Sequence, residues 1–343
     1  MADKSIQRLY RYIYGNWSTM ITRTYAELGI AELLAESPRS PEEIAEDTQS
    51  DPEALNLLLQ CAEELGFHRK DPESSKLILR EIGTLLNPHH PNSLHAAAIL
   101  NGEDYRYGPW GRLPEFVRSG DGREISPTWD TGSLPYLASR PSQLATFQKA
   151  MQDLSTATLS SENENRCIAS SIPLDQFSKI IDVGGGTGSL LSAIRERNAQ
   201  CALTLFDLPS VLAESTLAEE SRISLREGDF FEEIPPGYGA YLFKNVLHNH
   251  PKERLHKIFR NLAIALKKSP STSRAFFFEL IHGSSPRDPS RNSLIDMNLF
   301  LLVGGRVRSH EEYNELLSPH GLQIVSNHPL QSSARRALEI QLL

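Results

Sequence analysis

The chain has 343 residues, of which 39% are hydrophobic and 23% are charged, and its formal net charge is -8 at pH 7. A chain of this length can bury a full core, and its acidic balance argues against a nucleic-acid partner, because phosphate binding usually requires a basic surface. Three widely spaced cysteines outside any C-x-x-C pattern indicate reduced thiols and no zinc site, so we expect a cytoplasmic protein. The first residues lack the apolar stretch of a signal peptide, and no apolar run approaches the about 18 residues of a membrane helix. We therefore expect neither secretion nor membrane insertion.

Residues 1–95 carry the signals of several short helices. Apolar side chains recur at roughly helical spacing over 21–33, which predicts one helical face there. Ser-Pro-Glu-Glu at 40–43 has the pattern of a capped helix start, and Asp-Pro-Glu at 51–53 repeats it. Three short helices ending at Gly66, followed by a hairpin-like segment, are typical of a winged helix.

The charge of this region decides between two roles of a winged helix. From Glu27 to Gly66 the chain carries eleven acidic residues and one basic residue, Arg39. Such a surface repels phosphate, so DNA binding is disfavoured. We expect a domain that serves in packing or dimerisation, with no nucleic-acid partner.

The next segment predicts a connector between two domains. Residues 87–140 are rich in proline, glycine and aromatic residues, which indicates loops and short helices. A helix is predicted over 141–159, with Phe147 and Met151 on one face, where ordinary core packing is the alternative to a binding role. We place the domain boundaries at 1–95, 96–160 and 161–343.

From about residue 178 the pattern alternates between strand and helix. This alternation predicts parallel strands joined by helical crossovers, and hence an α/β fold with a doubly wound, mostly parallel sheet. Ligands of such sheets bind at the carboxyl ends of the strands.

Three strand ends carry residues suited to an adenosine. Gly184, Gly186 and Gly188 follow the first strand, and Ser189 breaks the G-x-G-x-x-G fingerprint, which disfavours a dinucleotide. Asp207, at the end of the next strand, is placed to accept both hydroxyls of a ribose, although capping the following helix is the alternative. Asp229 and Phe230, in the sequence G-D-F-F, are predicted to end the third strand and to offer an acid and an aromatic face to adenine.

The combined motifs D-V-G-G-G-T-G, F-D-L-P, G-D-F-F and L-F-K-N-V-L-H resemble those of S-adenosylmethionine-dependent methyltransferases of the caffeate and acetylserotonin O-methyltransferase type. The resemblance extends over nearly the whole chain. It implies a class I methyltransferase with a Rossmann-like, seven-stranded sheet and an N-terminal, mainly helical, winged-helix-like dimerisation domain. It also implies S-adenosyl-L-methionine as cofactor and a set of cofactor contacts: Gly184, Gly186, Asp207, Leu208, Asp229, Phe230 and Lys244.

The resemblance further implies that His248 is the general base. Transfer of a methyl group to a hydroxyl requires positioning and the removal of one proton, which an imidazole can accept. Glu279, at the end of the following strand, is expected to hold the other ring nitrogen of His248 and to set its tautomer. A metal site at His248 and His250 is disfavoured, because no Cys, Asp or Glu lies at ligand spacing.

Three positions depart from the family pattern. Asn249 and His250 stand where the family's H-D-W motif has aspartate and tryptophan, and Val307 stands where a second supporting glutamate is usual. A valine cannot orient an imidazole. The departure leaves three alternatives: an acidic acceptor, a carbon or nitrogen nucleophile, or a non-methylating reaction such as that of a cyclase, isomerase or hydroxylase.

By resemblance, an acceptor pocket forms between the connector and the segment of residues 291–305. Met and aromatic side chains adapt to flat apolar ligands, although each could equally be core. We expect a homodimeric O-methyltransferase that acts on a hydroxyl of a small aromatic or polyketide-like secondary metabolite. The expected pocket residues are Phe147, Met151, Asp296, Asn298 and Leu299, with Trp129 and Tyr136 near the mouth.

Overall fold

The structure is a computed structural model that describes residues 2–129, 131–157, 161–213, 215, 217, 222–282, 289–330 and 335–343. The chain forms two compact units. We call residues 1–111 with 139–160 the N-terminal unit, and residues 112–138 with 161–343 the C-terminal unit. The predicted connector, 96–160, is thus shared between the two units. In the described residues, no helix is both long enough and apolar enough to cross a membrane.

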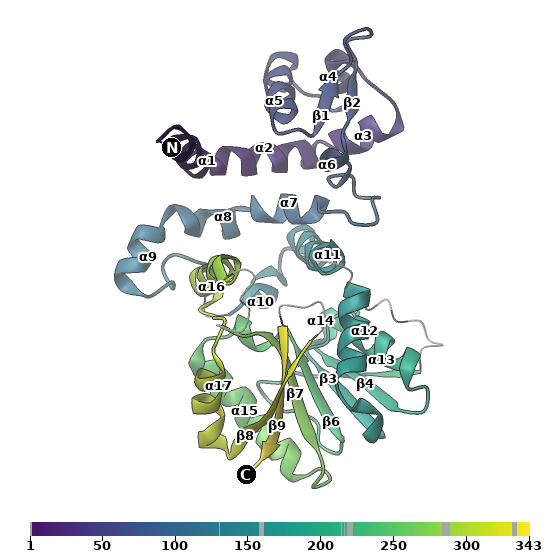
Figure 1. The fold of residues 1–343 in the computed structure, drawn as a ribbon, viewed down its shortest axis with the longest axis vertical. Coiled ribbons are helices and arrows are strands. Elements are labelled where there is room, and N and C mark those ends of the chain that lie inside the picture. Colours follow the sequence, from purple (N-terminus) through teal and green to yellow (C-terminus); the bar gives the residue numbers. More distant parts are fainter. Residues whose placement is uncertain are drawn as a thin grey trace. The chain divides into compact units, whose positions relative to one another are not determined.

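The N-terminal unit is mainly helical, with one small hairpin (Figure 1). Its elements are α1 (Ala2–Ile13), α2 (Gly15–Glu27), α3 (Ile30–Glu36), α4 (Pro41–Asp47), α5 (Pro52–Glu64), β1 (His68–Lys70), β2 (Leu77–Leu79), α6 (Glu81–Thr84), α7 (His95–Asn101), α8 (Asp104–Gly111) and α11 (Pro141–Ala157). The strands β1 and β2 pair antiparallel. The three short helices and the following hairpin agree with the predicted winged-helix-like order.

Local sequence signals explain the starts of α4 and α5 and the break between α2 and α3. Ser40 accepts a hydrogen bond from the Glu43 N–H and the Glu43 carboxylate accepts one from the Ser40 N–H, which is the predicted capping box. Asp51 is the N-cap of α5, where its side chain accepts a hydrogen bond from the Ala54 N–H. The single helix predicted over 21–33 is wrong, because the chain breaks at Gly29, whose φ of 66° is left-handed.

The C-terminal unit contains a seven-stranded sheet in the order β5-β4-β3-β6-β7-β9-β8. The strands are β3 (Lys179–Val183), β4 (Ala202–Asp207), β5 (Ile223–Glu227), β6 (Ala240–Lys244), β7 (Arg274–Leu280), β8 (Leu322–Pro329) and β9 (Arg335–Leu342). The first five strands are parallel, whereas β9 pairs antiparallel with both β7 and β8. This arrangement confirms the predicted doubly wound, mostly parallel sheet. The helices are α9 (Leu113–Ser119), α10 (Ser133–Leu137), α12 (Ser161–Ser171), α13 (Ser189–Arg197), α14 (Pro209–Leu212), α15 (Lys252–Lys267), α16 (Pro289–Val303) and α17 (His310–Leu317).

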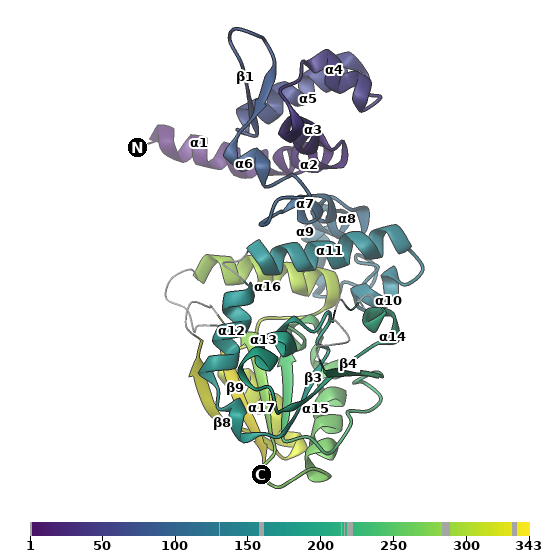
Figure 2. The same ribbon diagram turned by 90° about the vertical axis from the view of Figure 1, so that its right-hand side faces the viewer.

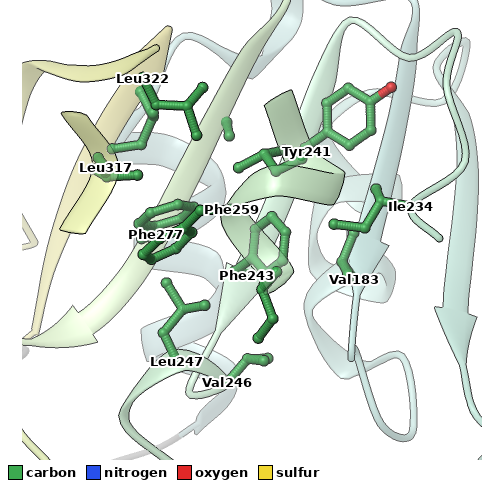
Figure 3. Packing of buried hydrophobic residues seen from close by; sticks show 14 of the residues in the cluster. Val183, Ile234, Tyr241, Phe243, Val246, Leu247, Phe259, Phe277, Leu317 and Leu322 are labelled. Atoms are coloured by element: carbon green, nitrogen blue, oxygen red, sulfur yellow. The ribbon is translucent and has the colours of Figure 1, made fainter. Parts of the chain in front are cut away.

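The sheet is buried on both faces because helices cover each of them (Figure 2). Ile181 and Phe277 belong to the core on the side of α15 and α17, whereas Ile180 and Phe276 belong to the core on the side of α12 and α13. Adjacent residues of one strand thus point to opposite faces, as the pleat requires. Figure 3 shows the first of these cores, where the rings of Phe259 and Phe277 stack with their centroids 5.8 Å apart.

Candidate active site

The glycine-rich turn after β3 has a backbone that only glycine adopts readily. Gly184, Gly186 and Gly188 have φ values of 70°, 60° and 82°. A β-carbon on Gly184 would also lie 3.0 Å from Val246 and 3.3 Å from Phe230. The turn is therefore bare backbone that leads directly into α13, and the first helical N–H groups of α13 point toward this turn.

Asp207 connects the end of β4 to this turn. Its side chain accepts hydrogen bonds from the Gly186 N–H, at 2.9 Å, and from the Leu208 N–H, at 2.8 Å. Burial raises the pKa of Asp207, and these two backbone donors oppose the rise. The helix-cap alternative is wrong, because α14 receives no side-chain cap. The carboxylate instead joins two neighbouring strand ends, and its unused lone pairs can accept further hydrogen bonds.

Asp229 and Phe230 follow β5 rather than ending it, because that strand stops at Glu227. The Asp229 carboxylate accepts a hydrogen bond from the Phe231 N–H at 2.8 Å. Asn261, on α15, donates to the carbonyls of Phe230 and Phe231, at 3.0 Å each. These contacts hold an aromatic side chain and an acid at the carboxyl end of the sheet, beside the glycine turn.

Two buried polar residues at this end of the sheet, Asp182 and Asn165, were not among the predicted site residues. Asp182, on β3, is 1% exposed, and neither of its carboxylate oxygens has a hydrogen-bond partner in the described part of the chain. Burial raises the pKa of Asp182 to about 7, with Lys244 opposing and Asp207 reinforcing the rise. Lys244, at the end of β6, donates to Asn165 at 2.6 Å. The signal for Asp182 was available, since an acid inside a buried central strand is rare without a partner or a function.

His248 and Glu279 lie side by side, as predicted from their strand ends. Glu279 is fully buried on β7, and one of its oxygens accepts the N–H groups of Val246, at 3.1 Å, and Leu247, at 2.8 Å. The other oxygen accepts a hydrogen bond from His248 Nδ1. This network assigns the proton to Nδ1 and leaves the Nε2 lone pair of His248 available as a base.

The turn that carries His248 is anchored in the core. The apolar pattern over residues 240–247 predicts a strand through residue 247, but the strand ends at Lys244. Asn245 then adopts a left-handed φ of 58° before a 3-10 turn at Leu247–Asn249. Val246 and Leu247 are buried among the core side chains (Figure 3). The residues on the N-terminal side of His248 therefore have little freedom to move.

His250 differs from His248 in every contact. Its ring packs against Phe230 and Phe231, with centroids 5.8 and 5.0 Å away, and its Nδ1 is buried without a partner among the residues described. Burial, reinforced by the positive charge of Arg254, lowers the pKa of His250 to about 3. This residue is neutral near pH 7 and packs where the family pattern has tryptophan.

The predicted pocket residues fall in both units. Asp296, Asn298 and Leu299 lie on α16 of the C-terminal unit, whereas Phe147 and Met151 lie on α11 of the N-terminal unit. Each set is thus gathered on one helix, and their meeting in one pocket stays a prediction. Trp129 and Tyr136 both belong to the C-terminal unit, where Trp129 packs with Phe116 and Phe300 in an aromatic cluster.

Val307 is fully buried, and its N–H donates to Asp296 at 2.7 Å. The second Asp296 oxygen lies 3.8 Å from the Arg306 guanidinium. The segment after α16 is therefore tied to that helix through the backbone of the residue that departs from the family pattern.

The chain is similar to proteins of known function over nearly its whole length. A family model described as an O-methyltransferase domain matches residues 110–323. The mitomycin biosynthesis 6-O-methyltransferase of Streptomyces lavendulae is 27% identical over 336 residues, or 96% of this chain and 92% of that protein. The 8-amino-8-demethylriboflavin N,N-dimethyltransferase of Streptomyces davaonensis is 28% identical over 94% of this chain and 92% of that protein. The solved structure of mitomycin 7-O-methyltransferase superposes with a TM-score of 0.86 at 25% identity, covering 100% of this chain and 99% of that one.

Proposed function

Because this chain belongs to the O-methyltransferase domain family, we propose that it methylates a hydroxyl of a small aromatic or polyketide-like secondary metabolite, with His248 as the general base. Membership of the family confirms the resemblance of the motifs, and the chain is an S-adenosylmethionine-dependent methyltransferase. The observation that carries the proposal is the His248–Glu279 pair, which lies at the same edge of the sheet as the glycine turn.

The residues at the ends of β3, β4 and β5 fit S-adenosylmethionine. A turn of three left-handed glycines leaves room for a ligand against the backbone, and Asp207 retains acceptor capacity for the ribose hydroxyls. Phe230 offers an aromatic face to the adenine, with Asp229 beside it and Lys244 at the end of β6. The orphaned carboxylate of Asp182 beneath the turn further supports a site that a ligand completes. When bound, S-adenosylmethionine supplies an electrophilic methyl group on a sulfonium centre.

The proposed role of His248 follows from its tautomer. Nε2 accepts the proton of the acceptor hydroxyl, and the resulting imidazolium is stabilised by the Glu279 carboxylate at Nδ1. Glu279 is already held by two backbone N–H groups, so it does not have to reorganise when the charge forms. The chain thus supplies a base of fixed orientation.

Replacement of the base tests this proposal. We expect His248→Ala to lower kcat by about 100-fold or more, while the affinity for S-adenosylhomocysteine, measured by calorimetry, changes by less than about twofold. His328→Ala is the matched control, because His328 pairs with Glu339 at 3.1 Å on the antiparallel strands β8 and β9. Unchanged turnover in His248→Ala would rule out the role.

Methylation of a nitrogen is the second candidate, favoured by the N,N-dimethyltransferase among the relatives and by the absence of a carboxylate at Val307. An amine attacks through its lone pair and loses its proton afterwards, so it depends less on a base. Assays with matched phenol and aniline acceptors distinguish the candidates. Hydroxyl methylation predicts product from the phenol and strong dependence on His248, whereas product from the aniline alone, insensitive to His248→Ala, would favour the second candidate.

We also propose that the acceptor is bound by Phe147, Met151, Asp296, Asn298 and Leu299.

We further propose that the protein is a homodimer formed through its N-terminal unit. The dimer is supported by exposed apolar side chains along α1 and α2, where Leu9, Ile13 and Trp17 are 57%, 55% and 59% exposed. Light scattering after gel filtration should give twice the mass of the chain, and the double variant Ile13→Glu, Trp17→Glu should give a monomer. A monomeric wild-type protein would contradict the proposal.

A further inference from the structure

A buried arginine, Arg308, contacts the turn that presents His248. Arg308 is 6% exposed, and its guanidinium donates to the carbonyl of His250 at 2.9 Å and approaches the carbonyl of Leu247 at 3.5 Å. These two carbonyls lie on either side of His248 in the sequence. One rigid guanidinium therefore reaches both ends of the catalytic turn, which a single lysine ammonium would not do with the same geometry.

Arg308 is itself held in place through both its backbone and its guanidinium. It pairs with Ile281 in a parallel bridge just beyond β7, and its carbonyl accepts the His282 N–H at 3.0 Å. Its guanidinium also donates to the Arg306 carbonyl at 3.1 Å. The side chain thus extends from a segment that is fixed to the end of the strand that carries Glu279.

The segment before Arg308 packs directly on the same turn. A β-carbon on Gly305 would lie 2.2 Å from the His248 carbonyl oxygen and 2.8 Å from the Asn249 carbonyl carbon. Only hydrogen fits between these backbones. Residues 305–308 therefore contact residues 247–250 at two points, through the backbone at Gly305 and through the guanidinium of Arg308.

The charges around the turn are complementary. Glu279 holds the N–H groups of Val246 and Leu247, and Arg308 holds carbonyls of the same turn. Burial lowers the pKa of Arg308, while Tyr313 and the charge of Glu279 oppose that effect. The carboxylate and the guanidinium thus act on opposite polar groups of one backbone turn. Val307, between Gly305 and Arg308, contributes no polar side chain.

We propose that Arg308 is a positioning residue for His248, fixing the turn so that the imidazole keeps its hydrogen bond to Glu279 although position 307 carries no carboxylate. The inference rests on the proposed role of His248 as the base. It assigns to Arg308 no contact with substrate or cofactor. Its effect passes through the backbone of the turn to the orientation of one ring.

The test compares Arg308→Gln with Arg195→Gln. Arg195 is a matched control, because its guanidinium also donates to backbone carbonyls, those of Ala199 and Cys201, at 2.8 Å each, at the far end of α13. We expect Arg308→Gln to lower kcat by about 10- to 100-fold with the affinity for S-adenosylhomocysteine within about twofold, since small displacements of a catalytic group are costly. Arg195→Gln should leave kcat unchanged, and Arg308→Lys should fall between wild type and Arg308→Gln.

A spectroscopic readout separates this inference from the proposed function. The Nδ1 proton shared by His248 and Glu279 should give a downfield proton NMR signal, assigned by its loss in His248→Ala. We expect the signal to weaken or vanish in Arg308→Gln and to persist in Arg195→Gln. An unchanged signal would overturn the inference even if kcat fell. A lost signal with turnover insensitive to His248→Ala would instead refute the base.

A double variant gives the second criterion. If Arg308 acts through His248, then adding Arg308→Gln to His248→Ala should lower turnover no further. Effects that multiply in the double variant would overturn the inference, because Arg308 would then act by another route. Thermal unfolding of each variant shows whether the protein is folded at the assay temperature.

Discussion

The carboxyl edge of the sheet has two halves that are built differently. The ends of β3, β4 and β5, which we call the cofactor side, carry the glycine turn, Asp207 and the buried Asp182. The ends of β6 and β7, which we call the base side, carry His248 and Glu279. On the cofactor side both Asp182 oxygens lack partners in the described residues, whereas on the base side both Glu279 oxygens accept hydrogen bonds.

This difference in hydrogen bonding suits the two proposed tasks, which are cofactor binding on one side and proton removal on the other. A buried polar group without a partner is costly, and a protein tolerates it where a ligand completes the contacts. A group that must act on a developing charge works best when its orientation is fixed beforehand. We therefore propose that the bound cofactor completes the cofactor side at Asp182, whereas the hydrogen bonds of Glu279 on the base side are complete before binding. Variants on the two sides should therefore affect different measurements.

The largest effect is expected on the base side from Glu279→Gln. The amide keeps the shape but cannot stabilise the imidazolium as a carboxylate does, so kcat should fall by about 10³-fold, with cofactor affinity nearly unchanged. Glu339→Gln is the control, since Glu339 also pairs with a histidine of the sheet, His328. Steady-state kinetics and calorimetry provide both measurements. A loss of cofactor affinity as large as the loss of kcat would erase the distinction between the two sides.

On the cofactor side, Asp207→Ala should act on binding. The change removes the acceptor of the Gly186 and Leu208 N–H groups together with the proposed ribose contact. We expect the dissociation constant of S-adenosylhomocysteine to rise by about 100-fold, and kcat at saturating cofactor to stay within a few-fold of wild type. The result that would contradict this picture is a low kcat at saturation with normal affinity.

A pair of glycines sharpens the comparison with smaller changes. Gly186 has open space around its α-carbon but a left-handed φ of 60°, whereas Gly305 has an ordinary φ but touches the His248 carbonyl. Gly186→Ala should strain the cofactor side, by about 1 kcal/mol, and weaken cofactor binding. Gly305→Ala should displace the catalytic turn and lower kcat by about tenfold. Isothermal titration and kinetics on both variants check this, and an exchange of the two phenotypes would be inconsistent with it.

The sequence predicted the parts of the site whose positions follow from strand order. Glycines and acids at successive strand ends, His248 after β6 and Glu279 at the end of β7 all meet at one edge, because parallel strands end together. Arg308 escaped prediction because its partners are backbone carbonyls, which carry no sequence signal. The contact between Arg308 and these carbonyls depends on how the segment after α16 returns to the sheet.

The errors in the predicted secondary structure also have local causes. The periodic pattern over 21–33 continued through Gly29, but a single left-handed residue was sufficient to start a new helix. Strand ends were placed too late at β5 and β6, where apolar residues continue into turns that are buried. Hydrophobic patterns report burial, and a buried turn such as Val246–Leu247 has the same pattern as a strand. The meeting of α11 and α16 side chains in one pocket stays a prediction.

The smallest effects concern the dependence of stability on pH, where Asp182 and His250 have opposite signs. The folded pKa of Asp182 is raised from 3.8 to about 7, so its contribution to stability is fully present below 3.8 and is lost as the pH rises through 7. The folded pKa of His250 is lowered from 6.5 to about 3, so its contribution is present above 6.5 and is lost as the pH falls toward 3.

Urea denaturation of Asp182→Asn and His250→Phe should resolve the two signs. Relative to wild type, Asp182→Asn should gain about 2 kcal/mol between pH 5.5 and pH 8, because it no longer has to ionise a buried carboxyl. His250→Phe should gain about 1 kcal/mol between pH 6.5 and pH 5.5, because its unfolded state no longer takes up that proton. Difference curves with slopes of the same sign would contradict the raised folded pKa of Asp182 or the lowered folded pKa of His250. Opposite slopes would support both shifts.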